Sequence, residues 1–89
     1  MKEKQVFYHV TGFEAVTKRD AANQLEISIE GKERHHVGLF FSKARAMSMA
    51  RYTKKKRNFF STEVVKTNLD GEFIERWKFK NGMLIENSQ

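Results

Sequence analysis

The chain has 89 residues, of which 39% are hydrophobic and 31% charged, with no cysteine and no proline. This composition excludes a disordered chain, a membrane protein, a disulfide framework and a thiolate metal site. Because residues 1–5 lead into only five largely apolar residues, with no signal peptide, we expect one small cytoplasmic domain over residues 1–89.

Positive charge is concentrated in one segment of the chain. There are 17 Lys and Arg against 11 Asp and Glu, which gives a net charge of +6. Residues 41–60 contain seven of the bases and no acid, whereas residues 1–40 are neutral and residues 61–89 carry a net charge of −1. A concentrated positive field attracts polyanions such as nucleic acid, an anionic membrane or an acidic protein surface.

The first half of the chain predicts strands. Residues 6–10 are aromatic and β-branched, and residues 25–30 alternate strictly between apolar and polar. A turn is expected at Gly31 within Glu30-Gly31-Lys32, followed by a further strand over residues 37–41. The apolar positions of the alternating run, which we expect to face a core, are Leu25, Ile27 and Ile29.

Residues 11–24 fit two alternatives. Thr11-Gly12-Phe13-Glu14 matches a helix capping box, in which Glu14 would reach back to the amide of Thr11. The same residues can instead extend the first strand, with residues 19–23 as a loop. The sequence favours neither, so the expected order is β-(α or β)-β-β-α-β-β.

A helix is predicted from Ser42 to about Asn58. The Ser42 hydroxyl is a good N-cap because it can accept a hydrogen bond from an otherwise unpaired amide of the first turn, and residues 43–52 contain no helix breaker. At about 100° per residue, small and apolar side chains share one side of this helix. The residues that we expect to face a sheet are Ala46, Met49, Ala50 and Thr53.

The last third of the chain predicts three more strands. Phe59 and Phe60 should enter the core, and strands are expected over residues 62–67, 73–79 and 83–86, with hairpin turns at Asp70-Gly71 and Asn81-Gly82. Alternation places one set of residues, Phe73, Trp77 and Phe79, on one face, and a second set, Ile74, Arg76, Lys78 and Lys80, on the other. The predicted fold class is α+β, an antiparallel meander sheet of about five strands with one main helix.

The basic helix is the strongest candidate site. Lys and Arg neutralise phosphates, and counterion release supplies the affinity. The alternative is an ordinary solvated helix face, and the helix dipole favours cations at the C-terminal end of a helix. Neither explanation accounts for Lys43 and Arg45 in the first turn, where the dipole disfavours cations. Neither accounts for the lack of any acidic residue that could form i,i+4 ion pairs with these cations. The residues expected to contact phosphate are Lys43, Arg45, Arg51, Lys54, Lys55, Lys56 and Arg57.

A second candidate surface is the row of cations on the strand over residues 73–80. Arg76, Lys78 and Lys80 could follow a phosphate backbone, and aromatic side chains on the same face could stack on bases. The residues considered for stacking are Phe7, His9, His36 and Phe40. The same cations are also expected on the solvent-exposed face of an ordinary amphipathic strand, where lysine discourages pairing between molecules. The sequence favours this structural explanation over a phosphate-binding role.

Catalysis and metal binding lack support in the sequence. There is no cysteine nucleophile, no glycine-rich phosphate loop and no nucleophile elbow, so we expect no enzyme. The adjacent His35 and His36 would point to opposite faces of a strand, and the spacing shows no histidine–carboxylate cluster, so no metal or cofactor is expected.

The expected function is therefore non-catalytic binding of DNA or RNA, with no assignable base preference. The alternative is a protein-interaction or regulatory accessory module, of the kind found in phages or mobile elements, whose basic helix docks an acidic partner or self-associates. Arg51 and Tyr52 would be its anchors. Membrane binding is disfavoured because Ala, Met and Thr offer little area for insertion. Residues 83–85 could pair two copies of the chain or form an internal strand.

Overall fold

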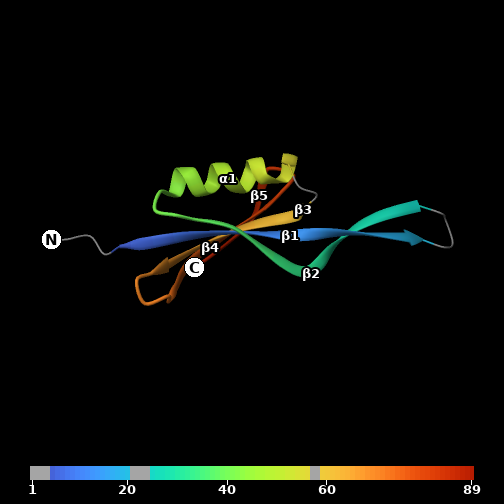
Figure 1. Cartoon of the computed structure of the whole chain (residues 1–89). Helices are drawn as coiled ribbons and strands as arrows, with labels where there is room; N and C mark the ends of the chain where they lie inside the picture. Colours follow the sequence, from blue (N-terminus) through green and yellow to red (C-terminus); the bar gives the residue numbers. More distant parts are fainter. Residues whose placement is uncertain (1–4, 21–24, 57–58) are drawn as a thin grey trace.

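The computed structural model describes residues 5–20, 25–56 and 59–89, and the side-chain positions at residues 19–20, 25–26 and 53–56 lie outside this description. In chain order the elements are β1 (Val6–Asp20), β2 (Leu25–Phe40), α1 (Lys43–Lys56), β3 (Phe59–Asn68), β4 (Phe73–Lys80) and β5 (Met83–Ser88). The five strands form one antiparallel sheet in the order β2-β1-β3-β4-β5, with α1 across one face (Figure 1). The predicted α+β class is confirmed.

β1 and β2 form one long antiparallel hairpin. Residues 11–20 belong to β1, so the strand alternative is confirmed and the capping-box helix is wrong. The reason is pairing, because β2 on one side and β3 on part of the other satisfy the backbone groups that a helix would satisfy internally. β1 continues through the start of the predicted loop, and residues 21–24 lie outside the described residues. The hairpin projects beyond the rest of the sheet (Figure 1), and the molecule measures 62 × 22 × 19 Å.

The predicted turn at Gly31 is wrong, because β2 runs through it without reversing. The ladder shifts register between Phe13 and Ala15, so that β2 bulges opposite Glu14. Gly31 is needed there for close approach, since a Cβ atom would lie 2.5 Å from Glu14 Cγ. Beyond the bulge the β1–β2 hairpin extends past the end of α1 (Figure 1), so the helix does not cover it. Ile27 is 48% exposed and therefore does not face the core, contrary to the expectation from alternation.

α1 begins as predicted and is rotated slightly from the predicted orientation. The backbone amide of Arg45 donates to Ser42 Oγ at 3.5 Å, which confirms the N-cap. Ala46 and Ala50 are buried, but Met47 packs against the core and Met49 is 37% exposed, so the expectation for Met49 is wrong. On a helix, residues 46, 47 and 50 form an apolar stripe as continuous as the stripe of residues 46, 49 and 50. Packing against the sheet selects the stripe that contains Met47. α1 ends at Lys56, and residues 57–58 lie outside the description.

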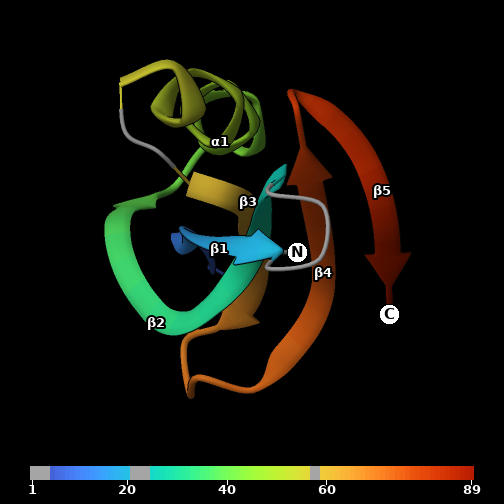
Figure 2. The ribbon, with the colours of Figure 1, turned by 90° about the vertical axis from the view of Figure 1, so that its right-hand side faces the viewer.

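The core lies between α1 and the sheet (Figure 2). Strand side chains from β1, β3 and β4 fill it: Tyr8, Val10, Val64, Trp77 and Phe79. The buried Thr62 hydroxyl donates to the carbonyl oxygen of Ala50 at 2.8 Å, which fixes the helix to β3. Phe73 is not on this face, because a register shift between Lys66 and Thr67 places Phe73 opposite Thr67 and leaves it exposed. One extra residue at that point reverses the alternation on which the prediction depended.

Candidate nucleic-acid interface

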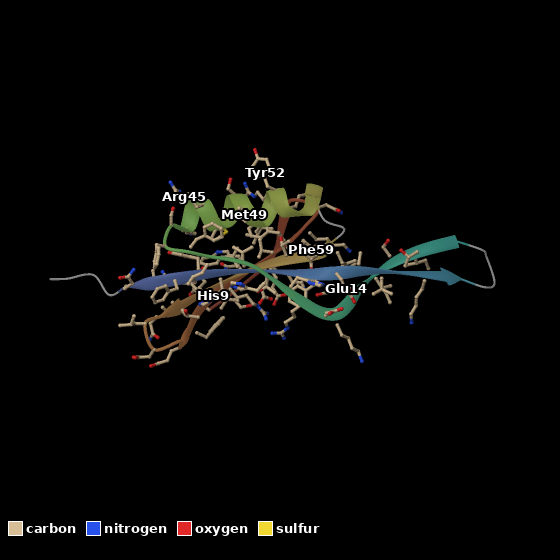
Figure 3. All side chains as sticks on the ribbon, in the orientation of Figure 1. His9, Glu14, Arg45, Met49, Tyr52 and Phe59 are labelled. Carbon is tan, nitrogen blue, oxygen red and sulfur yellow. The ribbon has the colours of Figure 1, made fainter. Side chains whose placement is uncertain are left out.

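α1 carries exposed cations and no acidic residue. Lys43, Arg45 and Arg51 are all exposed, and Arg45 and Tyr52 project away from the sheet (Figure 3). The helix continues through Lys54, Lys55 and Lys56, and Arg57 follows in the sequence; the side chains of these four lie outside the described residues. We call the seven basic residues of this segment the α1 cationic surface: Lys43, Arg45, Arg51, Lys54, Lys55, Lys56 and Arg57.

Two of these cations also cover aromatic rings of the core. Lys43 Nζ lies 4.9 Å from the centroid of the Trp77 ring, and the Arg51 guanidinium lies 5.5 Å from that of Phe79. Both rings are buried, and cations attract the faces of aromatic rings. This contact gives Lys43 a structural reason to occupy the first helical turn, which the sequence did not supply. Within the described part of the chain, Arg45 has neither a ring contact nor an acid within ion-pair distance.

Lys66 of β3 adds a positive charge over the core residue Tyr8, and its place there was not predicted from the sequence. Its Nζ lies 5.9 Å from the Tyr8 ring centroid, and the Tyr8 and Trp77 rings are 6.3 Å apart. Lys43 and Lys66 therefore each lie over one ring of the same aromatic pair. This proximity depends on the pairing of β1, β3 and β4, which local sequence does not show. Alternation along β3, which puts Lys66 on the same face as Val64, is the one available signal.

The cations of β4 have a different environment from those of α1. Alternation from Trp77 and Phe79 places Arg76 and Lys78 on the face away from the helix. The Arg76 guanidinium lies 2.7 Å from a Glu86 carboxylate oxygen and 3.9 Å from one of Glu63. Lys78 Nζ donates to both carboxylate oxygens of Glu30 at 3.1 Å.

Lys80 completes the row of β4 cations. Its Nζ lies 4.1 Å from the centroid of the Phe60 ring, and no ion pair involves it within the described residues. Arg76 and Lys78 are thus neutralised by acids of their own chain, whereas Lys80 covers an aromatic ring.

The sheet curls so strongly that β2 reaches β4. Glu30 belongs to β2 and Lys78 to β4, although β1 and β3 lie between these strands in the sheet. Ser61 of β3 donates a further hydrogen bond to Glu30 at 3.3 Å, and the curl is visible along the axis of β1 in Figure 2. The face opposite α1 is therefore curved around an internal ion pair and does not form a flat platform for bases.

The residues considered for stacking are divided by the sheet. Phe40 pairs with Tyr8 and packs against the core, so its expected place beside Phe7 and His9 is wrong. The exposed Phe41 lies there instead, with its ring centroid 5.5 Å from that of Phe7. His9 Nε2 is 2.9 Å from Thr67 Oγ1, so this imidazole is already hydrogen-bonded. His36 is exposed opposite Thr11.

The bulge in the β1–β2 hairpin brings together a histidine and two carboxylates. Glu14, Glu33 and His35 offer ligand atoms within 4.8 Å of one another, a proximity that the sequence spacing did not show because it depends on the bulge. Oxygen and imidazole ligands of this kind suit several divalent metals. His35 also lies 4.0 Å from Glu14 and its ring packs on Phe59, and these two contacts explain its position without an ion.

Comparisons with known proteins leave the function to be argued from this geometry. No protein-family model, curated protein or solved structure matches the chain. Within the described residues, no helix is long and apolar enough to cross a bilayer.

Proposed function

We propose that this protein binds nucleic acid, without chemistry of its own, through the α1 cationic surface. The observation that carries the proposal is a contrast between two sets of cations in one small molecule. Lys43, Arg45 and Arg51 are exposed with no acidic partner in the described residues, whereas Arg76 and Lys78 are paired with acids of the chain. Cations left without internal counter-charges retain their full attraction for phosphate.

The proposed contacts are on α1 and not on β4. Arg76 and Lys78 would have to give up ion pairs with Glu86 and Glu30 before they could contact phosphate. α1 lies across one face of the sheet and Arg45 is directed away from that sheet (Figure 3), so we expect a phosphate backbone to be able to approach the helix. Phosphate contacts carry no base information, so the proposal concerns binding and not sequence preference.

The test compares two double charge reversals of equal size. Lys43→Glu with Arg45→Glu alters the α1 cationic surface, and Lys18→Glu with Lys32→Glu alters exposed lysines of the hairpin. Fluorescence anisotropy with labelled single- and double-stranded DNA and RNA measures binding. We expect the helix variant to lose about tenfold or more in affinity and the hairpin variant to lose much less, because charge contributes most where it contacts phosphate.

Equal losses in the two variants would show attraction by net charge alone and would contradict the proposed site. Retention of no oligonucleotide at low ionic strength would contradict nucleic-acid binding itself. The second candidate function, docking of an acidic protein, is favoured by Tyr52, which is 60% exposed beside Arg51, a pairing typical of protein-interaction anchors. Polyglutamate that competes as well as oligonucleotide at equal charge would favour that alternative.

A further inference from the structure

β5 is an edge strand with an apolar outer surface. It is last in the sheet order and pairs with β4 on one side only, and none of the described helices and strands lies along its outer side (Figure 2). Its first three residues are apolar and solvent-exposed: Met83 is 69% exposed, Leu84 50% and Ile85 54%. An exposed edge presents unpaired backbone N–H and C=O groups, and apolar side chains beside them favour pairing with another strand.

The opposite edge of the sheet, formed by β2, is protected against pairing with another molecule, whereas β5 is not. β2 carries the exposed charged residues Lys32, Glu33 and Arg34 and has two register shifts, features that discourage pairing between molecules. β5 has no lysine and no proline, and its one charged residue, Glu86, is held by Arg76 of the same chain at 2.7 Å. One register shift against β4 is the only such feature in β5, and it leaves the apolar residues exposed.

We propose that β5 pairs antiparallel with β5 of a second copy of this chain, which joins two sheets into one across a twofold axis. The axis that fits the sequence of β5 passes through Leu84. It places Leu84 opposite its own copy and Met83 opposite Ile85, so that three apolar pairs form at the centre. Glu86 then lies opposite Gly82, which leaves room for its side chain and keeps the two carboxylates apart.

This arrangement puts both helices on one face. Antiparallel pairing of identical edges requires an axis perpendicular to the sheet, and such an axis keeps the α1 side of both copies on the same side. Strands are about 4.8 Å apart, so two helices that each lie mainly over β3 would be separated by roughly 24 Å when the distance is measured along the curved sheet. The dimer would double the cationic surface that is available to nucleic acid. This benefit rests on the proposed function, whereas the dimer itself does not depend on it.

The test uses sedimentation velocity of the protein alone, without nucleic acid, over about three decades of concentration, because small interfaces give weak dimers. The wild-type chain is expected to shift from monomer to dimer. Leu84→Lys, which places two positive charges opposite each other at the axis, should weaken dimerisation by about tenfold or more. Leu69→Lys is the matched control, since Leu69 is equally apolar and is exposed in the turn between β3 and β4.

Hydrogen exchange supplies a second readout that does not depend on a variant. Amides of β5 should become more protected as the wild-type concentration rises, while those of the β1–β2 hairpin should not change. A monomer at every concentration, or equal effects of the two leucine substitutions, would overturn the proposal. Oligomers larger than a dimer would also overturn it, because a twofold axis closes after two copies. Met83→Lys replaces Leu84→Lys if the latter lacks the circular dichroism spectrum of the folded chain.

Discussion

Lys43 shows how one side chain can contribute to packing and to surface charge. Its ammonium group lies over the buried Trp77 ring, while the side chain remains at the surface of α1. Long cationic side chains commonly bury their stems on apolar surface and keep the charged end in water. Lys43 therefore belongs to the proposed interface and also covers part of the core. Its removal should alter both the binding of nucleic acid and the environment of Trp77.

This double role can be measured through the single tryptophan of the chain. Lys43→Ala should expose Trp77 and shift its fluorescence emission to longer wavelength, with a loss of about 0.5–1 kcal/mol in the free energy of unfolding. Arg45→Ala is the control, because Arg45 contacts no aromatic ring in the described structure and should leave the emission unchanged. An identical spectrum for Lys43→Ala would show that the ring contact is absent in solution.

At the level of elements, the position of α1 depends on small residues. Ala46 and Ala50 are essentially inaccessible to solvent, and the hydrogen bond from Thr62 to Ala50 requires the helix to lie close to β3. Larger side chains at these positions would push the helix from the sheet. Because the proposed interface is the outer side of the same helix, the packing of the inner side orients it.

Two identical substitutions test this close packing. Ala46→Leu should lower the free energy of unfolding by about 1–3 kcal/mol, because added methyl groups overpack a dense core. Ala44→Leu, two residues away on the exposed side of α1, should change it by less than about 0.5 kcal/mol. Urea unfolding followed by circular dichroism measures both. Equal stability of the two variants would contradict the described orientation of α1.

Local signals predicted the elements well where the chain interacts mainly with its neighbours in sequence. The Ser42 cap begins α1, and Asn81 and Gly82 both have positive φ angles, 56° and 76°, as a two-residue hairpin turn of the Asn-Gly type requires. The errors at Gly31 and Phe73 have a common cause. Both lie at register shifts, and a bulge depends on the partner strand, which a single-sequence pattern does not contain.

The candidate site divides in the same way. The cations of α1 could be found in the sequence because they are clustered within residues 43–57 and lack neighbouring acids. The ion pair between Lys78 and Glu30 joins residues 48 positions apart, and the place of Lys66 beside Tyr8 depends on two strand pairings. No local pattern distinguishes a lysine that is neutralised in this way from one that remains available.

At the scale of the whole molecule, the cations of α1 and two cations of the opposite face differ in their partners. The curled face opposite α1 holds Arg76 and Lys78 against Glu30, Glu63 and Glu86, whereas Lys43, Arg45 and Arg51 of α1 have no acidic partner in the described structure. Residues 41–60, which include α1, contain seven of the 17 basic residues and no acid. Under the proposed function, we expect this distribution to steer a polyanion toward α1 before any specific contact forms.

The salt dependence of oligonucleotide binding tests the central claim most directly, because it counts the phosphates that the protein neutralises. If about four to six phosphates are contacted, the logarithm of the binding constant should fall against the logarithm of salt concentration with a slope of roughly −4 to −5. Lys43→Glu with Arg45→Glu should reduce the steepness by about 2, since two phosphate contacts are lost. A wild-type slope near zero, or the same slope in the variant, would contradict binding through the α1 cationic surface.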